Sequence, residues 1–254
     1  MIYDPLFLVI AALLVTMTGI SKAGFGAGVE MAVVPVMALF ILPTVAAAVV
    51  LPILLAIDAA NLVRYRRDWD RSLVAVLVSA AFVGVVLGAL SFEAFDADVL
   101  RFCLGVLALL FVAQRLLMGW LRRAASKPGG AFTFVFGAMT GFTSFVAHAG
   151  GPPSKMILLR HGLAKRAFVG TNAYLFAFIN ILKLFPYVGL GQITADTLWG
   201  SLVLAPFIPI GVALGFWLNT LVPERLFTAV VFTALTATGV KLVWDGLAAF
   251  FAWV

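Results

Sequence analysis

The chain has 254 residues, of which 64% are apolar and only 11% are charged, and its formal net charge is +6. A soluble globular domain carries about 25% charged residues, so this composition excludes water as the main solvent. The excess of Lys and Arg does not indicate a nucleic-acid partner, because these residues form short clusters between long apolar runs, as in the cytoplasmic loops of membrane proteins. We therefore expect an all-α integral membrane protein that lies in a lipid bilayer.

The first apolar region, Leu6–Leu42, is long enough for two membrane segments, each of which needs about 20 residues. It is interrupted by the glycine-rich run Gly24–Gly28, which we call the first break. The residues before this region lack the basic start of a signal peptide, so we expect the region to be retained. Three uninterrupted apolar segments follow, at Thr44–Tyr65, Arg71–Phe92 and Val99–Leu121.

The polar stretch Arg122–Gly130 separates this half of the chain from a second half with the same organisation. Ala131–Leu159 is again long enough for two segments and is interrupted by Ala149–Pro153, which we call the second break. Three further apolar segments follow, at Ala164–Leu190, Thr194–Leu221 and Pro223–Leu247. The single cysteine, Cys103, lies within an apolar run, where we interpret it as a packing residue.

Short motifs recur in the same order in the two halves, which favours a duplication. The matching pairs are Met17-Thr18-Gly19 with Met139-Thr140-Gly141, the run Gly84 to Gly88 with the run Gly211 to Gly215, and Asn61 with Asn180. We therefore predict one membrane domain built from two repeats, residues 1–126 and 127–254.

The charged loops predict the orientation of the segments. The basic loops, which should face the cytoplasm, contain Arg64, Arg66, Arg67 and Arg71, then Arg122, Arg123 and Lys127, then Arg160, Lys165 and Arg166. The loop with Glu93, Asp96 and Asp98 and the uncharged turn Gly189–Ile193 should face outward. Counting crossings from these loops places both termini outside the cytoplasm. Each half then has five segments, and an odd number makes the two repeats inverted.

The two breaks indicate a central site. Non-helical backbone at membrane depth is tolerated only inside protein or beside a water-filled cavity, whether the broken regions are re-entrant or full crossings. Secondary transporters place the ends of discontinuous helices at the substrate near the bilayer midplane. Pro152 and Pro153 stand where a new helix would start, and the free N–H groups of a helix N-terminus suit an anion. The alternative is that the glycines only allow helices to pack closely.

Three motifs resemble those of a known family. Gly24–Gly28 with the following Pro35, Ala147–Pro153, and Gly170-Thr171-Asn172 are similar to the paired motifs of the TauE/SafE family of sulfite exporters. The resemblance extends over nearly the whole chain. It implies a secondary transporter in the inner membrane of a prokaryote, with sulfite, sulfoacetate or other organosulfonates as substrates. Export is the expected direction, and proton coupling is a hypothesis.

The candidate substrate-binding residues belong to the breaks and to the motifs that resemble the family. They are Gly24, Gly26, Gly28, Gly150, Gly151, Pro152, Ser154, Lys155, Thr171 and Asn172. Ionisable residues within apolar spans are functional candidates because it is costly to bury a charge. On this ground the candidates for proton coupling are Glu30, His148 and Asp58.

Structural roles stay open for several ionisable and polar residues. Lys22 and Lys155 have side chains long enough to reach the membrane interface. Lys183 and Asp58 could instead form an ion pair with a structural role. His148 is alternatively a packing histidine, and Thr171 and Asn172 alternatively cross-link helices.

Other classes of function are weaker matches. The chain lacks the nucleophile and metal motifs of intramembrane enzymes and has no Gly-Lys dipeptide for a Walker A loop. We therefore expect no catalytic residues, no metal site and no cofactor. The alternatives that remain are a transporter or channel for another small anion, and a non-catalytic membrane subunit. No oligomeric state is predicted.

Overall fold

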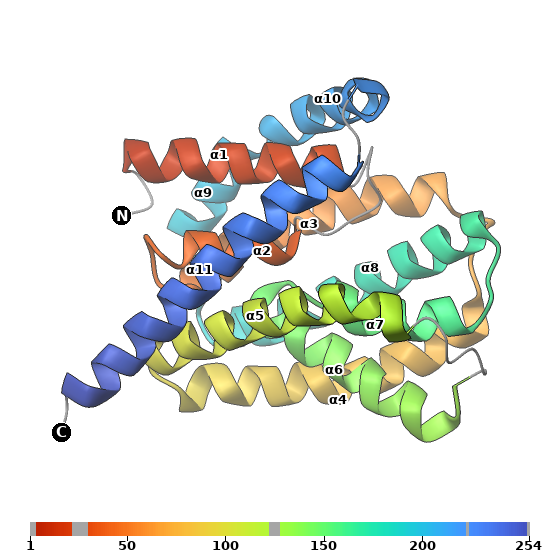
Figure 1. Ribbon diagram of the computed structural model, residues 1–254, viewed down its shortest axis with the longest axis horizontal. Coiled ribbons are helices and arrows are strands. Elements are labelled where there is room, and N and C mark those ends of the chain that lie inside the picture. The colour runs from red at the N-terminus through yellow and green to blue at the C-terminus, as the bar shows by residue number, and fades with distance from the viewer. Residues whose placement is uncertain (1–3, 22–29, 122–127, 222–223, 253–254) are drawn as a thin grey trace. The chain divides into compact units, whose positions relative to one another are not determined.

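The computed structural model describes residues 4–21, 30–121, 128–221 and 224–252, and within these ranges every regular element is a helix (Figure 1). The helices are α1 (Pro5–Ile20), α2 (Glu30–Met37), α3 (Pro43–Arg64), α4 (Arg71–Ala94), α5 (Ala97–Leu121), α6 (Gly130–Ala147), α7 (Gly151–Arg160), α8 (Lys165–Gly189), α9 (Ala195–Leu204), α10 (Phe207–Leu221) and α11 (Glu224–Ala252). The all-α prediction is confirmed.

Seven stretches in the described ranges are long and apolar enough to cross a membrane. They are Pro43–Arg64, Arg71–Ala94, Ala97–Leu116, Gly130–Ala147, Arg166–Gly189, Ala195–Leu214 and Ala229–Phe250. Six of them coincide with the uninterrupted segments predicted from the sequence, and Gly130–Ala147 is the part of the second broken region that precedes the break. The shorter helix α1 is also apolar. The prediction of a membrane protein with several helical spans is therefore confirmed.

The segment Thr194–Leu221 differs from the expected single helix. It forms two helices, α9 and α10, which meet at Ala205 and Pro206. Proline has no N–H group to donate to the carbonyl of Leu202, so the regular ladder of helix hydrogen bonds is interrupted there. The N–H of Ala205 instead lies 2.9 Å from the Ser201 oxygen and 3.3 Å from the Leu202 oxygen.

Several helices begin at polar side chains that cap their first turn. Asp4 accepts from the N–H groups of Leu6 and Phe7 at 2.8 and 3.2 Å, and Asp70 accepts from Leu73 N–H at 2.9 Å. Asp96 and Thr194 do the same for α5 and α9. These caps satisfy N–H groups that have no partner within the helix. Helix α7 begins differently, because its N-cap residue is Gly150 and no side chain caps it.

The chain forms two compact units. Unit 1 comprises Met1–Ile53, Phe95–Ala113 and Gln192–Val254, and unit 2 comprises Leu54–Ala94 and Gln114–Gly191. Each unit combines segments from both predicted repeats. The boundary predicted at residues 126 and 127 lies outside the described residues, and the assignment of the two repeats stays a prediction.

In unit 1, α1 packs closely against α10 through glycines. A Cβ atom at Gly19 would lie 2.9 Å from the carbonyl oxygen of Ile208, and a Cβ atom at Gly211 would collide with the carbonyl of Thr16. A second contact joins α2 to α5 and α11 through the small apolar cluster of Ala32, Ala108, Val231 and Leu235.

In unit 2, α4 and α6 run side by side in close contact (Figure 1). A Cβ atom at Gly84 would collide with the carbonyl of Ala138, and one at Gly141 would collide with the carbonyl of Ala81. Glycine therefore allows two backbones to approach each other, which is a common device between membrane helices. Helices α7 and α8 pack against this pair and against each other.

Candidate functional site

The second break lies entirely inside unit 2. Every residue from Thr143 to Ser154 is buried. Helix α6 ends at Ala147, and the N–H groups of His148 and Ala149 close it by donating to the carbonyls of Ser144 and Thr143, both at 3.1 Å. The irregular backbone is thus surrounded by protein, as a break at membrane depth requires.

The first turn of α7 has few backbone N–H donors, and the residues that carry them are closely packed. Pro152 and Pro153 carry no N–H group, so only Gly150 and Gly151 contribute donors to this helix start. A Cβ atom at Gly150 would lie 2.7 Å from the Thr140 oxygen and 2.9 Å from a ring carbon of Phe176, so only glycine fits there. A buried helix start without a side-chain cap is a suitable place for an anion.

Ser154 and Asn172 link α7 to α8. The Ser154 hydroxyl lies 2.9 Å from the Gly151 oxygen and 3.2 Å from Oδ1 of Asn172. Lys155 follows in the same helix and is half-buried. The structure therefore brings five of the predicted substrate residues together at the start of α7, and Asn172 joins them from α8. Those five residues are Gly150, Gly151, Pro152, Ser154 and Lys155.

Thr171 has a different neighbourhood from Asn172. Its buried hydroxyl accepts a hydrogen bond from the N–H of Asp70, at 2.9 Å, in the loop between α3 and α4. Gly170 packs against the carbonyl of Asp68, whose carboxylate pairs with Arg166 at 2.8 Å. The motif Gly170-Thr171-Asn172 therefore uses its first two residues to hold this loop, and only Asn172 contacts the first turn of α7 within the described hydrogen bonds.

The first break lies outside the described residues, and so do the predicted site residues Gly24, Gly26 and Gly28 and the neighbouring Lys22. Glu30, which was predicted for proton coupling, is the first residue of α2 and is half-buried.

A stripe of mostly polar side chains follows one face of α8. Its members are Asn172, Phe176, Asn180, Lys183 and Tyr187. Their spacing of three or four residues places them on the same face of a helix, over a length of about 22 Å. Each contacts another element of unit 2, so the stripe connects α7, α3, the second break and α6 along α8.

Asp58 and His148, the other two candidates for proton coupling, both lie against this stripe. Oδ2 of Asp58 accepts from Nδ2 of Asn180 at 2.6 Å, and both residues are 3% exposed. Oδ1 of Asn180 is buried and has no hydrogen-bond partner among the described residues. Nζ of Lys183 lies 2.6 Å from Nδ1 of His148, a contact that the sequence analysis did not predict. The spacing of the stripe places Lys183 on the same face of α8 as Asn172 and Asn180, but it does not identify the partner of Lys183.

The stripe ends in a cluster of aromatic rings. The hydroxyl of Tyr187 donates to the carbonyl of Phe145 at 2.8 Å, and these two rings meet edge to face with centroids 4.8 Å apart. Phe92 of α4 packs on both rings. The polar face of α8 is therefore closed at this end by packed aromatic side chains.

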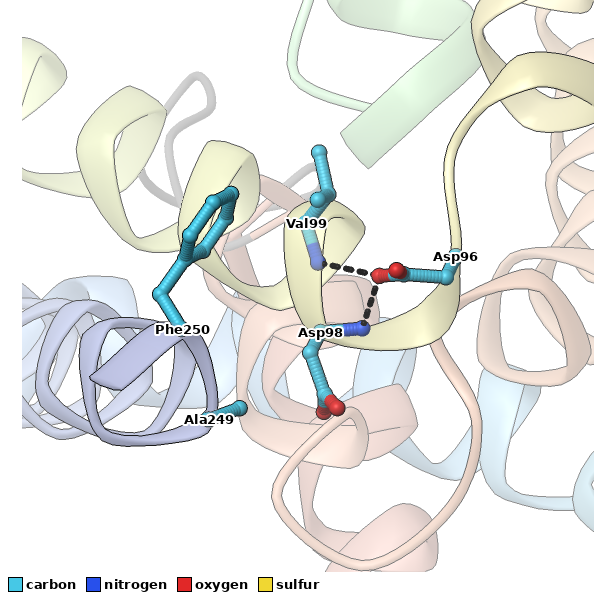
Figure 2. Close-up of a pocket in the computed structure, with 5 residues that line it drawn as sticks. All are labelled: Asp96, Asp98, Val99, Ala249 and Phe250. Atoms are coloured by element: carbon cyan, nitrogen blue, oxygen red, sulfur yellow. Dashed lines mark hydrogen bonds between the residues drawn. The ribbon is translucent and has the colours of Figure 1, made fainter. Parts of the chain in front are cut away.

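A cavity of about 250 Å³ in unit 1 has the wrong charge for an anion site (Figure 2). It is lined by Asp96, Asp98, Val99, Ala249 and Phe250. Figure 2 shows Asp96 accepting from the N–H groups of Asp98 and Val99, at 3.1 and 2.9 Å. Asp98 pairs with Arg101 at 2.6 Å. The two carboxylates serve the start of α5 and would repel an anion.

Comparison with known protein families agrees with the helical spans. The chain matches the family described as Sulfite exporter TauE/SafE over residues 10–242. The chain belongs to the TauE/SafE family. It is accordingly a membrane transporter protein, and the resemblance seen in its motifs is confirmed. Comparisons with curated proteins and with solved structures found no match.

The TauE/SafE match includes both breaks and the whole of α8. Within the described residues, no group of three or more His, Cys, Asp or Glu side chains is arranged to hold a metal ion. The chemistry of the site is that of backbone N–H groups, amides, hydroxyls and buried ionisable side chains, which suits binding and translocation of a small polar solute.

Proposed function

We propose that this TauE/SafE protein is a secondary transporter that exports small sulfur-containing anions, such as sulfite, sulfoacetate or other organosulfonates. The observation that carries the proposal is the buried, uncapped start of α7 in a chain that belongs to a sulfite exporter family. The N–H groups of Gly150 and Gly151 and the positive end of the helix dipole bind the anion oxygens. Lys155 and Asn172 are the side chains proposed to complete the site.

The transport cycle that we propose uses two inverted repeats. Two observations support it. In each half, the helix before the break packs on the fourth segment of the other half. Helix α1 packs on α10 through Gly19 and Gly211. Helix α6 packs on α4 through Gly141 and Gly84. Reciprocal contacts of this kind are expected when two equivalent halves are related by a pseudo-two-fold axis. The protein then lies in the inner membrane of a prokaryote with both termini outside the cytoplasm.

Thermal stabilisation of the purified protein tests the substrate class without knowledge of direction. A ligand that binds only the folded state raises the free energy of unfolding by about 2.7 kcal/mol at one hundred times its Kd. We expect sulfite, thiosulfate, sulfoacetate or taurine to raise the Tm more than acetate or malonate do. A Tm that rises only with the carboxylates would indicate a transporter of another anion. No rise with any anion would contradict the proposal.

A further inference from the structure

Two buried basic side chains of unit 2 are in direct contact. Nζ of Lys183 lies 2.6 Å from Nδ1 of His148, and the two residues are 0% and 3% exposed. An ammonium group can only donate, and a protonated imidazole can only donate from both nitrogens. A hydrogen bond between these atoms therefore requires that one of them lacks a proton. In this contact the two side chains therefore carry one proton fewer than they would if both were positively charged.

The surroundings of Lys183 indicate which residue carries the charge. Its Nζ atom also lies 3.0 Å from the carbonyl oxygen and 3.2 Å from the hydroxyl of Ser144. With Nδ1 of His148, three atoms that can accept a hydrogen bond thus lie within 3.2 Å of this nitrogen. The Ser144 carbonyl can only accept, and the helix dipole favours a cation at the C-terminal end of α6, so we infer that Lys183 is the donor in this contact and that Nδ1 of His148 is the acceptor.

The backbone of His148 points to a specific use of this side chain. His148 has φ of 52° and ψ of 28°, and among the described residues it is the only non-glycine with a positive φ. Glycine adopts this left-handed conformation without steric cost and is the usual residue at such a helix end. A histidine here supplies ring nitrogens beside Lys183 that glycine cannot supply, and strained backbone of this kind often marks a functional position.

We propose that Lys183 and His148 form the proton-binding site of this transporter, an inference that rests on the proposed anion transport. With one shared proton the pair is closed by its hydrogen bond. A second proton, taken by His148 at Nδ1, makes both facing groups donors and breaks the link between α8 and the second break. The one covalent bond that forms is the Nδ1–H bond, with a proton taken from water, and no covalent bond of the protein breaks.

Anion binding and this second proton favour each other. Two adjacent positive charges in a buried site repel each other, and an anion at the start of α7 offsets that repulsion. Binding free energies are reciprocal, so the anion draws a proton onto the pair and the proton strengthens anion binding. Anion and proton then enter the site together, which reduces the net charge that has to cross the membrane.

Other titratable and aromatic groups lie near the pair on the neighbouring helices. From α3, Asp58 contacts Asn180, which lies one turn before Lys183 on α8. From α8, the ring of Tyr187 lies 6.3 Å from that of His148, but its hydroxyl donates to the Phe145 carbonyl. From α4, the apolar Phe92 packs on Tyr187, and Glu93 beside it is exposed. From α7, Lys155 is half-buried in the second turn.

The first measurement concerns the protein without any ligand. The chain has two histidines, so His161→Asn leaves His148 as the single imidazole for nitrogen NMR of labelled protein in lipid nanodiscs. We expect a proton on Nε2 and a hydrogen-bonded Nδ1 at neutral pH. In Lys183→Met, the Nδ1 resonance of His148 should shift to the position of an imidazole nitrogen that accepts no hydrogen bond. In Lys183→Arg, the resonance should stay at its wild-type position. A proton on Nδ1 in the protein with Lys183 would overturn the inference even if the Lys183 variants do not fold.

The second measurement counts protons. Sulfoacetate is fully ionised at neutral pH, so protons taken up when it binds come to the protein. Calorimetry in buffers with different heats of ionisation should show uptake of up to about one proton per bound anion. His148→Asn, which tolerates the left-handed backbone, should abolish the difference between buffers, and His161→Asn should preserve it. Equal heats in all buffers for the wild-type protein would overturn the inference. If sulfite and sulfoacetate both fail to bind, the proposed function fails, and the NMR measurement still decides the state of the pair.

Discussion

Thr171 and Asn172 are adjacent in one motif of the family, but their side chains contact different parts of the protein. Its hydroxyl accepts from the N–H of Asp70 and is fully buried, whereas the adjacent Asn172 contacts Ser154 in the first turn of α7. Thr171→Val keeps the shape of the side chain but leaves that N–H without its acceptor. We expect a loss of about 1 to 3 kcal/mol in the free energy of unfolding, measured by denaturant titration in detergent.

Thr171→Ser is the matched control, because it retains the hydroxyl acceptor. It should remain within about 1 kcal/mol of the wild-type stability, since it removes only one methyl group. If Thr171→Val keeps full stability but loses anion binding, the hydroxyl acts on the substrate and not on the loop.

Lys155 lies in the second turn of α7 and is half-buried, so its ammonium is placed either to neutralise the anion or to reach the interface. If it neutralises the anion, Lys155→Met should weaken sulfoacetate binding by roughly 1.5 to 3 kcal/mol, which is about ten-fold or more in Kd. Isothermal calorimetry measures this, with Lys165→Met as the control at the start of α8. Equal Kd values for both variants and the wild type would remove Lys155 from the site.

At the scale of elements, the close contact of α4 and α6 depends on glycine. A Cβ atom at Gly141 would collide with the backbone of Ala81, whereas a Cβ atom at Gly130, also on α6, would have nothing within 4 Å. Gly141→Ala should therefore lower the free energy of unfolding by roughly 1 to 3 kcal/mol, because backbone atoms have to move. Gly130→Ala should be neutral or slightly stabilising. Similar stabilities of the two variants would show that the helices are not in close contact.

The elements that the sequence predicted well are those with a long local signal. Apolar runs of about 20 residues located the spans, and the glycine-proline run Ala149–Pro153 located the second break. The turn between α9 and α10 was missed because Pro206 lies inside a run that stays apolar on both sides. A hydropathy pattern does not distinguish a proline that kinks a helix from one that ends it.

The candidate site was predicted less completely than the spans, because its contacts join distant parts of the chain. Gly150, Gly151 and Ser154 are close in sequence and were found together. The contacts of Asn180 with Asp58 and of Lys183 with His148 connect α8 to residues 122 and 35 positions away. A single sequence does not specify which buried partner such a side chain meets.

At the scale of the whole molecule, the basic loops predict that both termini lie outside the cytoplasm. An impermeant maleimide should label a cysteine fused after Val254 in intact cells. It should label Ser126→Cys, whose position in the sequence lies between α5 and α6, only after the membrane is opened. Cys103, the single native cysteine, is replaced by Ala in both variants. Labelling of the two sites from the same side would show that the count of crossings, and with it the inverted repeat, is wrong.

The central claim is that the purified chain itself carries sulfur anions across a membrane by way of the second break. The most direct measurement is uptake of radiolabelled sulfite or sulfoacetate into liposomes that contain only this protein, against an excess of unlabelled anion inside. We expect saturable exchange that Gly150→Val abolishes, since the added side chain would meet Thr140 and Phe176, and that Gly130→Ala leaves intact. Uptake no faster than in protein-free liposomes, or uptake that Gly150→Val does not change, would contradict the account.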